Sequence, residues 1–109
     1  MRILVYYPDN APKKIDRDWL YGVDIITELE KRHPEWTFQH VNGSTEKAEL
    51  YRNVDVYLRP NRHDGTPIMV LESQVLGIPI VWSYEKGYYK EPDVDEIENR
   101  LRDIEKSLN

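Results

Sequence analysis

Along the chain, short apolar and aromatic runs alternate with segments in which apolar positions recur every three or four residues. The short runs cover residues 2–7, 36–41, 54–58 and 78–82, and each is followed within two residues by proline, glycine or a polar side chain. Short runs closed by turn residues are typical of strands. The pattern therefore predicts four strands.

The first segment with helical spacing begins at Asp16 or Asp18, either of which can act as an N-cap, and stops before Pro34. Basic residues at 31–33 suit the negative end of a helix dipole. The apolar stripe of this segment consists of Leu20, Val23 and Ile26, widened by Trp19, Ile25 and Leu29. We expect one continuous helix here.

Two other helices are expected from the same kind of pattern. A short one covers residues 46–52, with Ser44 or Thr45 as its cap, and the last one runs from Val94 to Leu108. On the outer face of the last helix, oppositely charged residues stand four positions apart, which favours a solvated surface. These pairs are Glu96 with Arg100 and Glu98 with Arg102.

A further helix follows the third predicted strand, with Thr66 as its N-cap, Pro67 as its first residue and Gly77 as its stop. Strand and helix thus alternate four times, which predicts parallel strands joined by right-handed crossovers. With 109 residues, the chain has the usual length of one domain. We expect a single α/β Rossmann-like domain whose parallel sheet has about four strands flanked by helices.

The amino-acid composition excludes or disfavours several classes of function. The absence of cysteine excludes disulfides, thiolate metal sites and cysteine nucleophiles, and a net charge of −5 disfavours nucleic acid as a partner. No apolar run approaches the roughly 20 residues that cross a bilayer, and the N-terminus lacks a signal-peptide pattern. We therefore expect no membrane span and a cytoplasmic location.

Ligands of parallel sheets bind beyond the carboxyl ends of the strands, where loops are polar and helices begin. Polar residues of this chain fall in these places, at Asp9, Asn10, 42–44, 59–64 and 83–87. Neither GxGxxG after the first strand nor GxxxxGK[ST] anywhere is present, so the usual phosphate loops are missing.

Residues 59–81 form the richest of these segments. Gly65 lets a ligand approach the backbone, and the helix start at Thr66 and Pro67 leaves free N–H groups, which together favour an anion site. Glu72 lies in the middle of an apolar helix, where a carboxylate needs hydrogen bonds. Two readings stay open: Glu72 pairs with a protein group, or it accepts hydrogen bonds from sugar hydroxyls.

The segment from Val54 to Val81 resembles the donor-site signature of retaining GT-B glycosyltransferases, the group 1 family that includes sucrose-phosphate synthase and bacterial mannosyltransferases. Asp64 and Glu72 are separated by seven residues, as the two carboxylates of that family are. The resemblance implies that Asp64 contacts the donor sugar and Glu72 the ribose. It also implies that the residues nearest the diphosphate are Gly65, Thr66, Pro67 and Ile68.

A second match, Tyr21-Gly-Val-Asp-Ile-Ile, is similar to the Lys-Gly motif that opens the first helix of the family's C-terminal domain. The departures are Tyr21 in place of the phosphate-binding lysine, Asp64 in place of glutamate and Asn61 in place of serine. The chain begins directly at what resembles the second half of a GT-B fold. We therefore expect half of that fold, without the acceptor domain.

Three cations stand at predicted strand ends and are candidates for binding a diphosphate: Arg59, Arg62 and Lys86. Each is equally explained as an ordinary surface charge. The histidines His33, His40 and His63 lack the spacing of a metal or triad site, and we expect neither a metal nor a cofactor.

Two hypotheses follow. In the first, the chain is a glycosyltransferase-like domain that binds a nucleotide sugar as donor, works with an acceptor-domain partner or as a homodimer, and transfers no sugar alone. In the second, it is a non-catalytic nucleotide-binding or protein-interaction module that retains the fold. A phosphoacceptor receiver domain is disfavoured because the third strand ends in Leu58-Arg59-Pro60, without a carboxylate.

Overall fold

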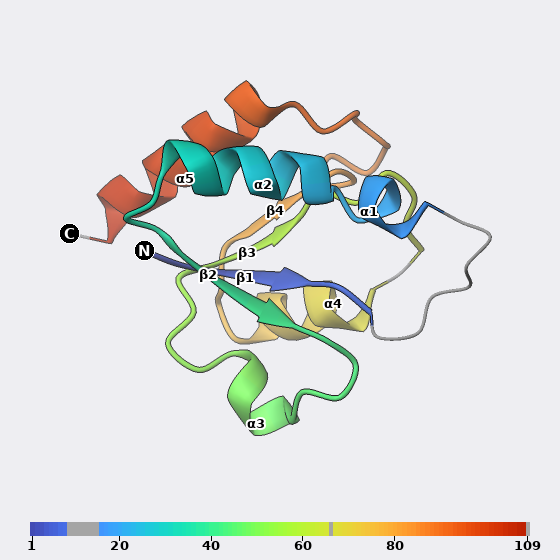
Figure 1. The fold of residues 1–109 in the computed structure, drawn as a ribbon. Coiled ribbons are helices and arrows are strands. Elements are labelled where there is room, and N and C mark those ends of the chain that lie inside the picture. The colour runs from blue at the N-terminus through green and yellow to red at the C-terminus, as the bar shows by residue number, and fades with distance from the viewer. Residues whose placement is uncertain (9–15, 66, 109) are drawn as a thin grey trace.

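The structure, a computed structural model, describes residues 1–8, 16–65 and 67–108. Strands and helices alternate along the chain (Figure 1). In chain order the elements are β1 (Arg2–Tyr6), α1 (Arg17–Leu20), α2 (Val23–Arg32), β2 (Thr37–Val41), α3 (Lys47–Leu50), β3 (Val56–Arg59), α4 (Ile68–Val75), β4 (Ile80–Trp82) and α5 (Val94–Ser107).

The strands form one sheet in the order β2-β1-β3-β4, and every pairing is parallel. Leu4 of β1 pairs with Tyr57 of β3, and Leu58 of β3 pairs with Val81 of β4. The carboxyl ends of all the strands therefore lie at one edge, where their loops can meet. This confirms the predicted α/β class and a single Rossmann-like domain.

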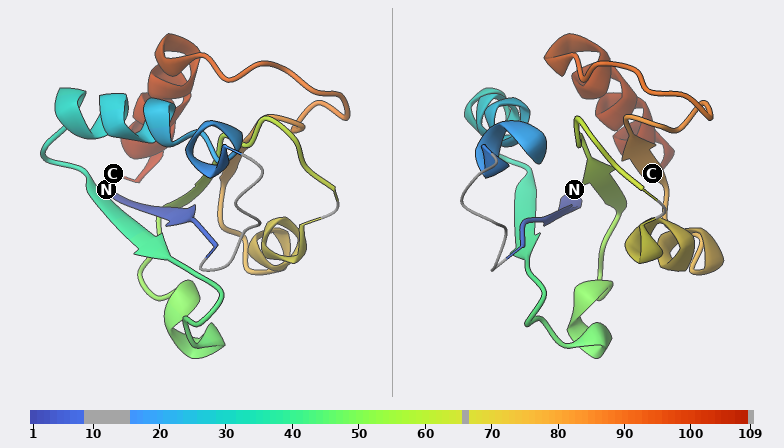
Figure 2. Two further views of the ribbon diagram at one scale, coloured as in Figure 1. Left: turned by 45° about the vertical axis from the view of Figure 1, so that its right-hand side comes forward. Right: turned by 90° about the vertical axis from the view of Figure 1, so that its right-hand side faces the viewer.

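Helices cover both faces of the sheet: α2 and α5 lie on one face, and α3 and α4 on the other (Figures 1 and 2). Along β3, Val56 and Leu58 join the core under α2 and α5, while Tyr57 between them joins the core under α3 and α4. This alternation follows from the two-residue period of a strand. The strand is buried on both sides because it is central to the sheet.

The first predicted helix is in fact two helices. Asp16 caps α1 by accepting a hydrogen bond from the Trp19 amide (3.2 Å), so Asp18 is not the cap. Gly22 then breaks the helix with a φ of 68°, and an added Cβ there would lie 2.4 Å from the Pro60 oxygen. The expectation of one continuous helix was wrong because this close approach requires glycine in a left-handed conformation.

Two caps differ from expectation, and one helix stop is confirmed. Glu46 occupies the N-cap of α3 without a side-chain hydrogen bond, whereas the Thr45 hydroxyl accepts one from the Asn42 amide (3.1 Å) in the preceding turn. Pro67 is the N-cap of α4, so the helix begins one residue later than predicted, and Thr66 lies outside the described residues. Gly77 ends α4 with a φ of 72°.

Helix α5 begins at an Asp93 cap that accepts hydrogen bonds from the amides of Asp95 and Glu96. Of the two expected charge pairs on its surface, Glu98 with Arg102 forms, at 3.8 Å. The other does not appear among the ion pairs of the described residues. Arg100 contacts Glu85 and Glu96 contacts Lys90 instead, because the β4–α5 loop packs against this helix. Within residues 1–8, 16–65 and 67–108, no helix is long and apolar enough to cross a membrane.

Candidate functional site

Two loops occupy the carboxyl edge of the sheet beside the central strands. The first, the β3–α4 loop, runs from Pro60 to Pro67, and the second, the β4–α5 loop, runs from Ser83 to Asp93. Because β3 and β4 are adjacent, the two loops leave the sheet side by side. Most of the predicted site residues belong to these loops or to the strand ends next to them.

The carboxylate of Asp64 is bound by side chains of β3 and β4. Arg59 donates to both of its oxygens, from Nε to Oδ2 (2.6 Å) and from Nη2 to Oδ1 (2.9 Å), and the Trp82 indole donates to Oδ2 (2.8 Å). The Asp64 side chain is only 6% exposed. A planar guanidinium that binds a carboxylate in this two-bond form fixes the position of both. Asp64 thus ties the β3–α4 loop to the sheet.

Arg59 is the centre of this cluster. Besides Asp64 it donates to the Tyr57 hydroxyl (2.8 Å), and its side chain is largely buried. Burial alone would lower the pKa of Arg59, but the hydrogen bonds to Asp64 and Tyr57 raise it above its ordinary value. Its charge is neutralised within the protein.

Arg62 is held in the same way by residues from distant segments. Its guanidinium donates to both oxygens of Asp24 (2.8 Å each), to Glu91 (3.0 Å) and to the Trp19 carbonyl (2.6 Å). The hydrogen bond to Asp24 and then the one to Glu91 raise the pKa of Arg62, although burial opposes the shift. The guanidinium also lies over the Trp19 ring, 5.1 Å from its centre. Arg62 therefore joins α1, α2 and both loops.

The start of α4 is open, in contrast. A Cβ added at Gly65 would meet nothing within 4 Å, and the Ile68 side chain is 66% exposed. The first helical hydrogen bond of α4 runs from the Val70 amide to the Pro67 carbonyl (3.2 Å), so the amides of Ile68 and Met69 precede it. Pro67 and Ile68 form this helix start, and Gly65 precedes it in the loop.

Glu72 lies on the side of α4 that faces α3. Its Oε1 accepts from the Tyr51 hydroxyl (3.1 Å), and its Oε2 lies 3.1 Å from Nζ of Lys47. Burial and the hydrogen bond to Glu72 raise the pKa of Tyr51. The two carboxylates that the sequence pairs, Asp64 and Glu72, share no hydrogen-bonding partner among the described residues. A ribose contact for Glu72 stays a prediction.

Lys86 lies in the β4–α5 loop. It is exposed and lines a pocket of about 330 Å³ between β4, the β4–α5 loop and α5. Asp64 and Glu72 do not line this pocket. Of the three predicted cations, Arg59 and Arg62 are engaged by carboxylates, and Lys86 makes no ion pair within the described part of the chain.

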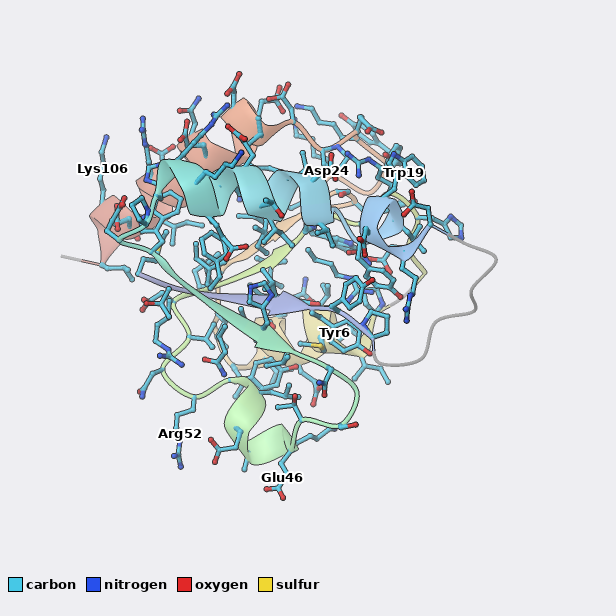
Figure 3. All side chains as sticks on the ribbon, viewed as in Figure 1. Tyr6, Trp19, Asp24, Glu46, Arg52 and Lys106 are labelled. Atoms are coloured by element: carbon cyan, nitrogen blue, oxygen red, sulfur yellow. The ribbon has the colours of Figure 1, made fainter. Side chains whose placement is uncertain are left out.

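Sequence reasoning missed a group of tyrosines at the carboxyl end of β1. Tyr21 contacts Tyr6 and Tyr7 edge to face, with ring centres 6.4 and 5.8 Å apart. Figure 3 labels Tyr6 at this end of the strand. The three rings line a hollow of about 470 Å³ over β1, β2 and α2, in which the Tyr7 hydroxyl donates to Asp18 (2.6 Å). The doublet Tyr6-Tyr7 at a strand end was the available signal.

The three histidines do not form a site in the described residues. His33 ends α2 and lies 2.7 Å from Glu35 and from Glu98, while His40 lies in β2 and His63 is exposed. In the part of the chain that the structure describes, no three potential metal-ligating side chains lie together. The predicted loop residues Asp9 and Asn10 lie outside the described residues.

Comparison of the chain with protein-family models, with curated proteins and with solved structures finds no match.

Proposed function

We propose that this domain binds a nucleotide sugar, as the donor-binding half of a GT-B glycosyltransferase does. One observation carries the proposal. The segment that resembles the donor-site signature folds as β3, loop, α4 and β4, and its loop lies at the carboxyl edge of a parallel sheet. Nucleotides bind parallel sheets at that edge.

The start of α4 supports binding of the diphosphate. The amides of Ile68 and Met69 come before the first hydrogen bond of the helix, and Pro67 at the N-cap makes no side-chain cap. Free amides and the positive end of the helix dipole attract an anion. Gly65 leaves room beside them because, apart from its neighbours in the chain, no atom of the described residues stands within 4 Å of the place of a Cβ.

The proposed role is binding of the donor rather than transfer on its own. Sugar transfer requires a donor and an acceptor held together in a site that excludes water and stabilises the leaving diphosphate. The 109 residues form one domain, so the acceptor surface has to come from a partner domain or a second copy. Purified chain with nucleotide sugars and an acceptor panel is expected to release no glycosylated product.

Amide chemical shifts of the ¹⁵N-labelled chain test the proposal directly. Titration with UDP, GDP and ADP and with their sugars is expected to shift the amides of Gly65, Ile68 and Met69 in a saturable way for one nucleotide. Unchanged shifts at these three amides with every nucleotide would refute donor binding.

A substitution at Glu72 tests its assigned contact with ribose. Glu72→Gln is expected to weaken the nucleotide by about 1–3 kcal/mol, the size of a lost charged hydrogen bond. Glu46→Gln, at the N-cap of α3, is the matched control, because Glu46 is exposed and its side chain makes no cap hydrogen bond (Figure 3). An unchanged affinity for the nucleotide together with a lower free energy of unfolding would instead show that Glu72 has only a structural role, through its contacts with Lys47 and Tyr51.

The second candidate function, a protein-interaction module, has one observation in its favour. Four apolar side chains on α4 and its end are exposed: Ile68 by 66%, Leu71 by 49%, Val75 by 87% and Leu76 by 57%. Contiguous exposed apolar side chains mark contact surfaces. Sedimentation at rising concentration tests it: association that Val75→Lys abolishes, together with no nucleotide binding, would favour this function over donor binding.

A further inference from the structure

The pocket beside β4 has an apolar floor that belongs to the core. Val81 and Ile97 are members of the cluster under α2 and α5, and Pro60 closes the floor. Helix α5 covers the face of the sheet on which Val81 and Ile97 lie, and α4 covers the opposite face (Figure 2). Its volume of about 330 Å³ lies at the lower end of the range for small-molecule sites.

Charged side chains form the rim of the pocket, and most of them neutralise one another. Lys90 lies 2.6 Å from Glu96, and Arg100 lies 2.7 Å from Glu85. The first of these pairs raises the pKa of Lys90. The charges of these four side chains are therefore paired with one another.

The other two carboxylates of the rim are also engaged. Glu91 accepts from Arg62 (3.0 Å), and Asp93 accepts from the first amides of α5. Lys86 is the one cation of the lining that makes no ion pair within the described residues, because Lys90 and Arg100 are paired with Glu96 and Glu85. An anion bound here would therefore meet an unpaired cation at Lys86.

Two polar side chains of the lining also make no hydrogen bond to the described residues. Ser83 is 9% exposed, and its hydroxyl oxygen is buried without a partner among the described residues. Buried hydroxyls are normally hydrogen-bonded, so an unpaired one points to a missing partner. Asn99 of α5 also lines the pocket, and its side chain makes no hydrogen bond within residues 1–8, 16–65 and 67–108.

We propose that this pocket binds an organic monoanion, whose apolar ring packs on Val81 and Ile97 and whose carboxylate or phosphate meets Lys86. Ser83 and Asn99 supply the remaining hydrogen bonds. The ligand is distinct from the nucleotide sugar, because neither Asp64, Glu72 nor the start of α4 lines this pocket. The proposal does not depend on donor binding.

Three probes separate the parts of this recognition in ¹⁵N shift titrations of the whole chain. Benzoate carries a ring and one charge, benzyl alcohol carries the ring without the charge, and inorganic phosphate carries charge without the ring. Benzoate is expected to shift the amides of Val81, Ser83, Lys86 and Asn99 in a saturable way. Each of the other two is expected to bind at least about tenfold more weakly, because it lacks one of the two contributions.

Variants assign the binding to the pocket. Lys86→Gln is expected to weaken benzoate about tenfold, the effect of losing one charged hydrogen bond. Lys106→Gln, at the far end of α5, should leave it unchanged (Figure 3). Ser83→Ala is expected to weaken benzoate without lowering the free energy of unfolding, because it removes a buried hydroxyl that has no partner.

Several outcomes would overturn the proposal. These are no saturable shift with benzoate, equal effects of Lys86→Gln and Lys106→Gln, or benzoate shifts confined to Gly65, Ile68 and Met69. If Ser83→Ala lowers the free energy of unfolding but leaves the benzoate affinity unchanged, the Ser83 hydroxyl is hydrogen-bonded to water and has only a structural role. Donor binding is measured with UDP, GDP and ADP on the amides of Gly65, Ile68 and Met69. Either proposal can therefore fail while the other stands.

Discussion

The two loops that leave the sheet side by side differ in how completely their polar side chains are paired. In the β3–α4 loop, Asp64 and Arg62 are buried in hydrogen bonds to other segments, with side chains 6% exposed in each case. In the β4–α5 loop, Lys86 is exposed and the Ser83 hydroxyl is unpaired within the described residues. The charged groups of the first loop fix it to other segments, whereas the second loop has, besides its ion pairs, one cation and one hydroxyl without a partner in the described residues.

This difference predicts different costs of substitution. Removing one partner of a buried ion pair leaves the other charge buried and unpaired, which lowers the free energy of unfolding by several kcal/mol, roughly 3–5. Removing an exposed charge without a partner changes stability little. Substitutions in the β3–α4 loop should therefore act on folding, and those at Lys86 on binding.

The largest effect is expected for Asp64→Asn, which leaves Arg59 without its counter-charge. We expect the free energy of unfolding, measured by urea denaturation, to fall by about 3–5 kcal/mol. Asp103→Asn on α5 is the matched control, because Asp103 is exposed. A loss of donor affinity at unchanged stability would contradict the structural role and support the predicted sugar contact.

The next effect concerns the point at which the β3–α4 loop meets the break between α1 and α2. Gly22→Ala places a Cβ 2.4 Å from the Pro60 oxygen at a φ of 68°, whereas Gly77→Ala has a similar φ of 72° and open space. We expect thermal or urea unfolding to show a loss of about 1–2 kcal/mol for Gly77→Ala from the conformation alone. The added overlap should bring Gly22→Ala to about 2–4 kcal/mol. Equal losses would mean that Pro60 yields to the methyl group.

The smallest effect is pH dependence through Asp24. Its hydrogen bonds to Arg62 hold its pKa below the ordinary value, although burial opposes the shift. A carboxyl whose pKa is lowered by folding stabilises the protein above its unfolded pKa, and this contribution is lost as the pH falls through the folded pKa. The stability difference between the parent chain and Asp24→Asn should therefore shrink between about pH 5 and pH 2.

Asp24 is 57% exposed at its side chain, so the pH effect is expected to be modest. Figure 3 shows Asp24 at the amino-terminal end of α2. Unfolding free energies of the parent chain and of Asp24→Asn, measured across that range, check the prediction. A difference that is constant with pH would show that Arg62 does not depress the pKa of Asp24.

The strands and the long helices could be predicted because each depends on a local pattern. The alternation along β3 and the stripe of α5 are periods of one element, and both follow from burying one face. The break at Gly22 could not be predicted in this way. It depends on the close approach of Pro60, which is distant in sequence.

The candidate site could likewise be predicted only where it depends on local sequence. Arg59 and Arg62 stand at a strand end, which favours anion binding, but Arg62 pairs with Asp24 and Glu91 from other parts of the chain. Sequence position gives no information on such partners. Lys86 differs only in that no carboxylate of the described residues reaches it.

The strand order has a consequence for the time course of folding. Arg2 pairs with Thr37 and Ile3 with Val56, so the first strand has no partner close to it in the sequence. Pairings between distant segments form late, because the intervening chain must be closed first. Until then Ile3, Leu4 and Val5, which are at most 2% exposed in the folded domain, remain in water. An unpaired apolar strand of this kind is the segment through which partly folded chains would associate at high concentration.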